Sequence, residues 1–339
     1  MNASQRPLPL SIVPWFLGLV AAGAAIGFTG CDANFTISGG YSFTKTGETA
    51  EQEDSGEIDS QVTNVRIRNQ FGTVTIDQAP EGQSPSWTWK GKVWSPTQEQ
   101  ADEFAQQLVV EVKTEGDTQT WTLLMPEAVP ELKGVESNLQ LRIGSNVAVD
   151  LVNKHGDSLI SNISNDVEAA SSFGDVVVNS VEGNVTVNSK HSDVAVKEVS
   201  GKADLETSFG KLMASNVVGD AELNNSHGDI EAMVAGKVIA KTSFGNAMIE
   251  ADSAEVKVTN SHGDVTLTVK NPEFSDVNVK TKFGKITLKL PEGVSPKVEM
   301  DTSFGDEDSE FGNDKSSQQH VKLDNSHGDI QIIKWKPQE

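Results

Sequence analysis

The chain has one cysteine, one tyrosine and few basic residues for its acidic content: 27 lysines and arginines stand against 49 aspartates and glutamates. A single cysteine excludes an intramolecular disulfide, so stability must come from burial and backbone hydrogen bonds. The net charge of −22 at pH 7 repels nucleic acid and bare anionic membrane alike. It therefore argues against nucleic acid as a partner and against direct binding to an anionic lipid surface.

The N-terminal residues have the character of a targeting segment. The chain is apolar from Leu8 to Phe28, and this stretch ends at Cys31, behind two small residues. Such a pattern is typical of a bacterial lipoprotein signal, whose cysteine is lipidated after cleavage; an ordinary secretory signal and a membrane-spanning anchor are the alternatives. We expect a signal peptide at 1–30, a membrane anchor through lipid on Cys31, and a place in the bacterial cell envelope facing the periplasm or the exterior.

Residues 31–60 are expected to form the lipidated Cys31 and a flexible acidic tether. The stretch 49–60 is acidic and nearly free of apolar side chains. A segment of this composition cannot bury a core of its own.

Residues 61–146 are expected to form a β-rich segment with one helix. Ser95 is the expected N-cap, and apolar residues recur with helical spacing from Ala101 to Leu108, which predicts a helix that covers a sheet. Trp87 and Trp89 share one strand face. Core packing is the favoured interpretation of this pair, and a sugar-stacking platform is the alternative.

Residues 147–339 carry a repeat and a C-terminal cap. The repeated phrase is Ser or Lys, then His or Phe, then usually Gly, then most often Asp, and it recurs about every 18 residues, which indicates a stacked architecture. The aromatic anchors of the phrase are His155, Phe173, His191, Phe209, His227, Phe244, His262, Phe283, Phe304 and His327.

Each repeat also carries the pattern of a β-strand. The third and fifth residues after the anchor are mostly apolar and alternate with polar ones, which predicts a short strand with one face inward. In-phase strands stack as parallel ladders. The sequence therefore predicts an all-β fold: a parallel β-solenoid of about 18 residues per coil.

The residue after each anchor is expected at a corner that needs a positive φ or a close backbone approach. Ser192 interrupts the series, which predicts an altered corner there. The corner glycines are Gly156, Gly174, Gly210, Gly228, Gly245, Gly263, Gly284, Gly305 and Gly328.

The residue two places after the anchor indicates how many repeats make one coil. With one repeat per coil, this column alternates acidic residues with Lys or Asn from Asp193 to Asp306, which cross-strand electrostatics favour. With two repeats per coil, unrelieved carboxylates would face one another. We therefore expect Lys211 to lie beside both Asp193 and Asp229.

The same stacking places His and Phe alternately in one column. Ring on ring at strand spacing is favourable, and it leaves the histidines about 10 Å apart, too far for one ion. A structural stacking column is the favoured interpretation over a metal or acid–base site. We predict no metal, no cofactor and no catalytic residue.

The far end of the repeat is irregular. We expect the acidic stretch 306–314 to be a solvated loop, with weak calcium binding as the alternative. Trp335 is expected to cover the open end of the solenoid.

The repeated S-x-G-D-[VI] phrase, following a segment of sheet and helix, resembles the bacterial putative adhesin family. The resemblance covers about Val65 to Ile333 and is carried by the ten phrases around the anchors. It implies a right-handed parallel β-helix and an envelope protein, and it supplies no established ligand and no catalytic residue.

The leading hypothesis is a non-catalytic envelope lipoprotein: an adhesin-like binding or scaffolding module, with an unidentified protein or glycan as ligand. A β-helix enzyme acting on polysaccharide, of lyase or glycosidase type, is one alternative, with Asp175, Asp193 and Lys190 as its nearest candidate residues. An accessory subunit of an envelope complex, docking through the helix at 95–108, is another.

Overall fold

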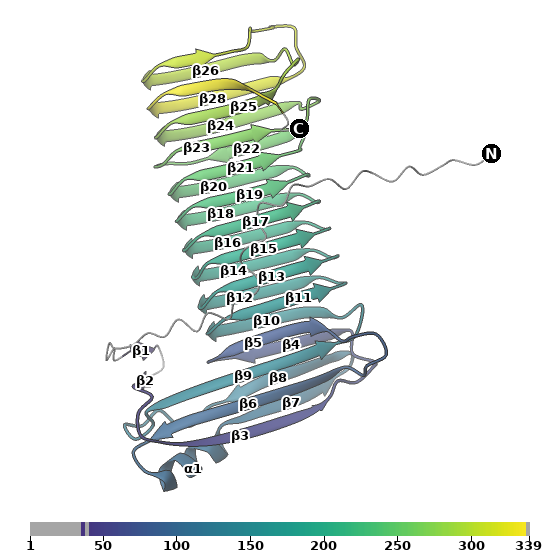
Figure 1. Ribbon diagram of the computed structural model, residues 1–339, viewed down its shortest axis with the longest axis vertical. Coiled ribbons are helices and arrows are strands. Elements are labelled where there is room, and N and C mark those ends of the chain that lie inside the picture. The colour runs from purple at the N-terminus through teal and green to yellow at the C-terminus, as the bar shows by residue number, and fades with distance from the viewer. Residues whose placement is uncertain (1–34, 38–40, 337–339) are drawn as a thin grey trace, which may run out of the picture.

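The computed structural model describes residues 35–37 and 41–336, which are almost entirely β-structure. Two long sheets, of 13 and 14 strands, run side by side along the molecule, with a cap at one end (Figure 1). We call them sheet 1 and sheet 2. None of the described helical residues forms a segment long and apolar enough to cross a membrane. Cys31 and the stretch Leu8 to Phe28 lie outside the described residues.

The rod is built from coils of two strands, one in each sheet. In spatial order, sheet 1 contains β4 (Asn64–Asn69), β10 (Ala148–His155), β12 (Val167–Phe173), β14 (Val185–His191), β16 (Ala203–Phe209), β18 (Ala221–His227), β20 (Val238–Phe244), β22 (Glu255–Thr259), β24 (Asp276–Phe283), β28 (His320–His327) and β26 (Lys297–Phe304). Sheet 2 contains β5 (Thr73–Gln78), β11 (Ser158–Ile163), β13 (Val176–Val181), β15 (Val194–Val199), β17 (Leu212–Val217), β19 (Ile230–Val234), β21 (Ala247–Ala251), β23 (Val265–Val269), β25 (Ile286–Pro291), β29 (Ile330–Trp335) and β27 (Glu307–Ser309).

Equivalent residues of successive repeats pair directly and in parallel. Val149 pairs with Val167, and Val167 with Val185. Asp193 and Asp229 flank Lys211, since Val194 pairs with Leu212 and Leu212 with Ile230. One repeat per coil is therefore confirmed, while the right hand expected from the family stays a prediction.

The core is an apolar column between the two sheets. Alternate residues point inward and are almost fully buried, as Val176 and Val178 are at 0% exposure. In four successive coils of sheet 2 one residue near the end of the strand adopts the left-handed conformation, as Asn162 does with φ 57°. This bulge lets Ile160 and Ile163 both face the core although they are three residues apart.

The predicted boundary at residue 147 is wrong, because the solenoid begins earlier. Strands β4 and β5 form its first coil and pair directly with β10 and β11. Between β5 and β10 the chain leaves the rod and builds the cap, which continues both sheets. The cap contains β6 (Ser86–Ser95), α1 (Gln98–Gln107), β7 (Val109–Glu115), β8 (Thr118–Leu124) and β9 (Gly134–Ile143). The early copy of the repeat at Phe71 marks the true start.

The predicted flexible tether is wrong for residues 48–57, which form β3 (Glu48–Glu57). This strand pairs with β6 along its whole length. It needs no core of its own, because backbone hydrogen bonds hold it and two of its carboxylates meet lysines of β6: Glu53 contacts Lys90 and Glu51 contacts Lys92. Strands β1 (Phe35–Ile37) and β2 (Tyr41–Phe43) form a separate antiparallel pair.

Helix α1 covers the cap sheet as expected, with Ala101 and Ala105 buried. Its N-cap is Thr97 rather than Ser95: the Thr97 Oγ1 accepts a hydrogen bond from the Gln100 N–H. Ser95 belongs to β6 and donates to the Glu131 carbonyl instead.

The last two coils are threaded out of sequence order. Strands β28 and β29 lie between the preceding coil and the coil of β26 and β27, so the outermost coil is not the last in the chain (Figure 1). Two expectations are therefore wrong. Trp335 pairs beside Pro291 rather than covering the end, and residues 307–309 of the acidic stretch form a strand. The open edge is partly closed by side chains, since the Asn313 amide bonds both the N–H and the carbonyl of Val298.

Candidate functional site

One edge of the rod carries a continuous ladder of aromatic rings at the turn from sheet 1 into sheet 2. Neighbouring rings are nearly parallel, at 9–20°, with centroids 4.7–5.1 Å apart. In spatial order the rings are Phe71, His155, Phe173, His191, Phe209, His227, Phe244, His262, Phe283, His327 and Phe304. The unusual threading of the last coils makes Phe and His alternate without a break.

Most ladder rings show an edge to solvent and their faces to their neighbours, whereas Phe71 at the cap end is buried, at 5% exposure. Phe209, for example, is 45% exposed although both of its faces are covered. Phe304 ends the ladder, stacks on His327 alone and is 69% exposed. At the other end Phe43 meets Phe71 edge-on. Stacking therefore covers the faces of the interior rings, so that this corner presents ring edges and not open aromatic faces.

A column of short polar side chains follows the ladder. The Asp193 Oδ1 accepts a hydrogen bond from the Lys211 N–H of the next coil at 2.7 Å, and the same contact recurs from Asp157, Asp175, Asp229 and Asp264. Asn246 replaces the carboxylate without loss of the contact. These acids therefore serve as backbone acceptors, and each keeps its second oxygen at the surface. The lysine side chain points elsewhere: the Lys211 Nζ binds Glu231 at 2.7 Å.

The glycine corner is confirmed for most of the series. Gly174 has φ 106°, and a Cβ there would lie 2.4 Å from the carbonyl carbon of Gly156 in the coil below. At such a glycine a side chain would clash because the backbones of successive coils touch. Neither Ser192 nor Gly305 has a positive φ, so the corner is altered at these two coils.

Two further ladders were not predicted. Two residues before each ring lies an Asn, Ser or Thr, which in most coils bonds the corner carbonyls: the Asn260 Nδ2 donates to Gly245 O and Gly263 O at 2.9 and 3.0 Å. Ser189 and Thr281 are buried at the same position without such a bond. The opposite corner has a second glycine column, in which a Cβ at Gly201 would lie 2.4 Å from Gly183 O. The recurring phrases N-S-H-G and T-S-F-G, and the glycines spaced as the anchors are, carried these signals in the sequence.

Two ladder groups have shifted pKa values. Burial, together with the positive charge of Lys154, lowers the pKa of His155. Burial also raises the pKa of Asp175, and the carboxylates of Asp193 and Asp157 add to this, although the N–H of Asp193 acts in the opposite direction. Asp157, Asp175 and Asp193 form a run of acids without an intervening Lys or Asn, so charge is concentrated in these coils.

Two candidate residues of the enzyme alternative belong to the repeated pattern and do not interrupt it. Asp175 and Asp193 are consecutive members of the acceptor column, and each repeats the backbone contact of its neighbours. Among residues 35–37 and 41–336, no three His, Cys, Asp or Glu side chains are placed to hold a metal ion.

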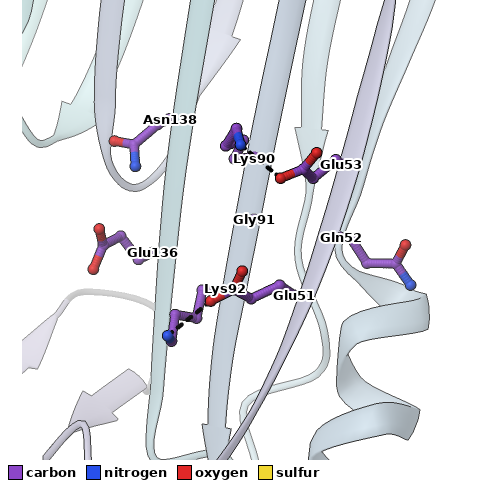
Figure 2. A pocket seen from close by; sticks show the side chains of 8 residues that line it. All are labelled: Glu51, Gln52, Glu53, Lys90, Gly91, Lys92, Glu136 and Asn138. Atoms are coloured by element: carbon purple, nitrogen blue, oxygen red, sulfur yellow. Dashed lines mark hydrogen bonds and ion pairs between the residues drawn. The ribbon is translucent and has the colours of Figure 1, made fainter.

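The cap carries a shallow hollow of about 270 Å³ on its outer face, beside Gly91 (Figure 2). Its charges neutralise each other: Lys90 meets Glu53 at 2.6 Å and Lys92 meets Glu51 at 2.8 Å. The tryptophans predicted nearby are core residues. Trp87 is 6% and Trp89 2% exposed, and the Trp89 Nε1 donates to Ser137, so the sugar-platform alternative is wrong for this pair.

Comparison with known proteins is informative at the level of the family. No curated protein matches the chain. A structure described as a putative adhesin from Parabacteroides distasonis has a TM-score of 0.33 at 10% identity, covering 85% of this chain and 98% of that one. One from Parabacteroides merdae has 0.33 at 11%, with the same coverage. A putative cell adhesion protein from Clostridium sporogenes has 0.21 at 11%, covering 84% and 100%. Residues 110–333, well over half of the chain, match the Toastrack DUF4097 family, and the chain belongs to that family.

Proposed function

We propose that the protein is a non-catalytic, adhesin-like lipoprotein of the bacterial envelope, held to the membrane by lipid on Cys31. Its rod presents the ladder corner and the adjoining sheet faces as a binding surface for a protein or glycan. The observation that carries the proposal is the repetition of the corner. The ring stacking continues through every coil, and the glycine and acid contacts recur in most of them, whereas a catalytic centre needs residues that interrupt such a pattern.

The dimensions of the rod agree with a display role. Its eleven coils, at about 4.8 Å per step, give a height of roughly 50 Å. With β3 part of the cap, the segment between Cys31 and the folded region is shorter than the sequence indicated, which holds the cap close to the membrane. The rod then projects its coils away from the surface.

Two experiments test the proposal. If the anchor is a lipid, the wild-type chain should incorporate radiolabelled palmitate and the Cys31→Ala variant should not. Equal labelling of both chains would contradict anchoring. Incubation with acidic glycans is expected to release no products. Release that Asp193→Asn abolishes would replace the binding role with an enzymatic one.

A further inference from the structure

The outer face of sheet 2 carries an apolar stripe where a solvent-facing sheet normally shows polar side chains. Leu159, Val177, Ala195 and Met213 are direct neighbours in one outward column; Glu231 follows, and then Met248. Met233 lies in the next column, beside Ser215. The exposed fractions are 38% for Leu159, 37% for Val177, 38% for Met233 and 57% for Met248. We call these six apolar residues the sheet 2 stripe.

The same column supplies an internal comparison. Beyond Met248 the equivalent positions are Thr266, Thr287 and Gln331. The parallel pairing continues there, although these coils lack the left-handed residue of the first four. Parallel pairing alone therefore does not require apolar residues at these positions. Apolar side chains gathered on one part of an otherwise polar face indicate an interaction surface, and methionines are typical of surfaces that adapt to varied apolar partners.

The charge beside the stripe identifies the chemistry of the partner. Asp157, Asp175 and Asp193 border the stripe and are three consecutive acids of the acceptor column with no Lys or Asn between them. Elsewhere in the described column two acids adjoin only at the far end of the rod, where Asp306 follows Asp329. Two lysines of the coils that carry the stripe are already paired: Lys211 with Glu231 at 2.7 Å and Lys197 with Glu198 at 3.6 Å. No ion pair among the described residues involves the three aspartates, so their negative charge is available to a basic partner.

The length of the stripe agrees with one helix. Five strand steps from Leu159 to Met248 span about 24 Å, which matches roughly 16 residues of α-helix at 1.5 Å per residue. We propose that the sheet 2 stripe binds a basic amphipathic helix of a partner protein, with the apolar face of the helix on the stripe and its basic residues toward the three aspartates. This proposal names the partner for the binding surface and so rests on the proposed function.

The test uses the full chain and a fluorescein-labelled peptide of about 18 leucine and lysine residues with helical periodicity. Its isomer has the same composition in an order that lacks the period. Binding is followed by fluorescence anisotropy. We expect the periodic peptide to bind and the isomer to bind at least about tenfold more weakly, a difference of one decade in Kd.

Two variants separate apolar contact from charge. The triple change Val177→Thr, Met213→Thr and Met248→Thr installs the residue that the column itself uses at 266 and 287, and should weaken binding at least about tenfold. The triple change of the aspartates to asparagine preserves the acceptor contact, as Asn246 does for the N–H of Asp264, and should weaken binding and reduce its dependence on salt.

Asp264→Asn is the matched control, because it makes the same change outside the stripe and its acceptor contact is the same. It should leave binding within about twofold. Absence of binding by the periodic peptide, equal binding of both peptides, or threonine variants that bind as the wild type does would overturn the proposal. So would stripe-dependent binding to phosphatidylcholine vesicles in place of the peptide. None of these results depends on Cys31 labelling or glycan cleavage, so the two proposals fail separately.

Discussion

The ring ladder should stabilise the rod in proportion to the number of ring faces that are covered. Phe209 stacks on His191 at 5.0 Å and on His227 at 4.7 Å. If each pair contributes about 0.5–1.5 kcal/mol, Phe209→Ala removes about 1–3 kcal/mol of stacking. Phe209 is 45% exposed, so its lost burial adds about 1 kcal/mol. The total is about 2–4 kcal/mol.

The terminal ring provides the comparison. Phe304 has one ring partner, His327, and is 69% exposed. Phe304→Ala should therefore cost about 1–2 kcal/mol, roughly half of the effect at Phe209. Phe209→Leu retains apolar area and loses only the stacking, so its cost should lie between that of the alanine variant and zero.

Native-state hydrogen exchange is the appropriate assay, because stacked repeats open locally and do not always unfold in one step. The amides of β14, β16 and β18 should exchange faster in Phe209→Ala, and those of β26 and β28 in Phe304→Ala. Equal free-energy losses at the two positions would refute the reasoning. A wild-type value for Phe209→Leu would show that stacking itself contributes nothing.

Three further predictions concern the corner. Gly174→Ala should destabilise the protein by several kcal/mol, because it adds a backbone clash to an unfavourable φ. Gly293 has φ 90° but open space around the position of a Cβ, so Gly293→Ala should cost only about 1–2 kcal/mol in a thermal melt. Similar costs at the two positions would contradict the clash. Asp175→Asn should stabilise slightly at neutral pH, because folding raises the pKa of this carboxyl and so disfavours its charged form; a lower melting temperature would contradict this. The pKa of His155 is lowered by folding, so its contribution to stability is complete above about pH 6.5 and declines as the pH falls below it. Denaturation at about pH 7 and pH 5 should show a smaller difference for His155→Phe than for the wild type, and an unchanged difference would contradict the assignment.

The sequence was sufficient to predict the coil. The spacing of the anchors and the placement of Lys211 among the acids indicated the register, because every coil repeats the same local chemistry and neighbouring coils must be compatible. The predictions at the corner succeeded for a related reason: where the corner has a positive φ and the backbones of successive coils touch, as between Gly174 and Gly156, only glycine fits.

The cap and β3 were harder to predict, because their structure depends on partners distant in sequence. The residues of β3 are acidic and polar, and nothing local distinguishes them from a tether. Their order comes from backbone pairing with β6, some forty residues later, and from lysines on that strand. The start of the solenoid was missed because the cap interrupts it after one coil, leaving Phe71 isolated in the sequence from the ring that stacks on it, His155.

The order of the last two coils follows from their composition. The coil of β28 and β29 places Val321, Leu323, Ile330 and Ile332 inward, all at 0–1% exposure. The coil of β26 and β27 has Glu307 and Ser309 at the equivalent positions of sheet 2. Between two apolar coils these groups would lose their water without gaining partners. At the end of the rod Glu307 instead bonds the Thr302 N–H of the edge strand. The polar coil therefore belongs outermost although it comes earlier in the chain, and the alternation of Phe283, His327 and Phe304 in the ladder is preserved by the same arrangement.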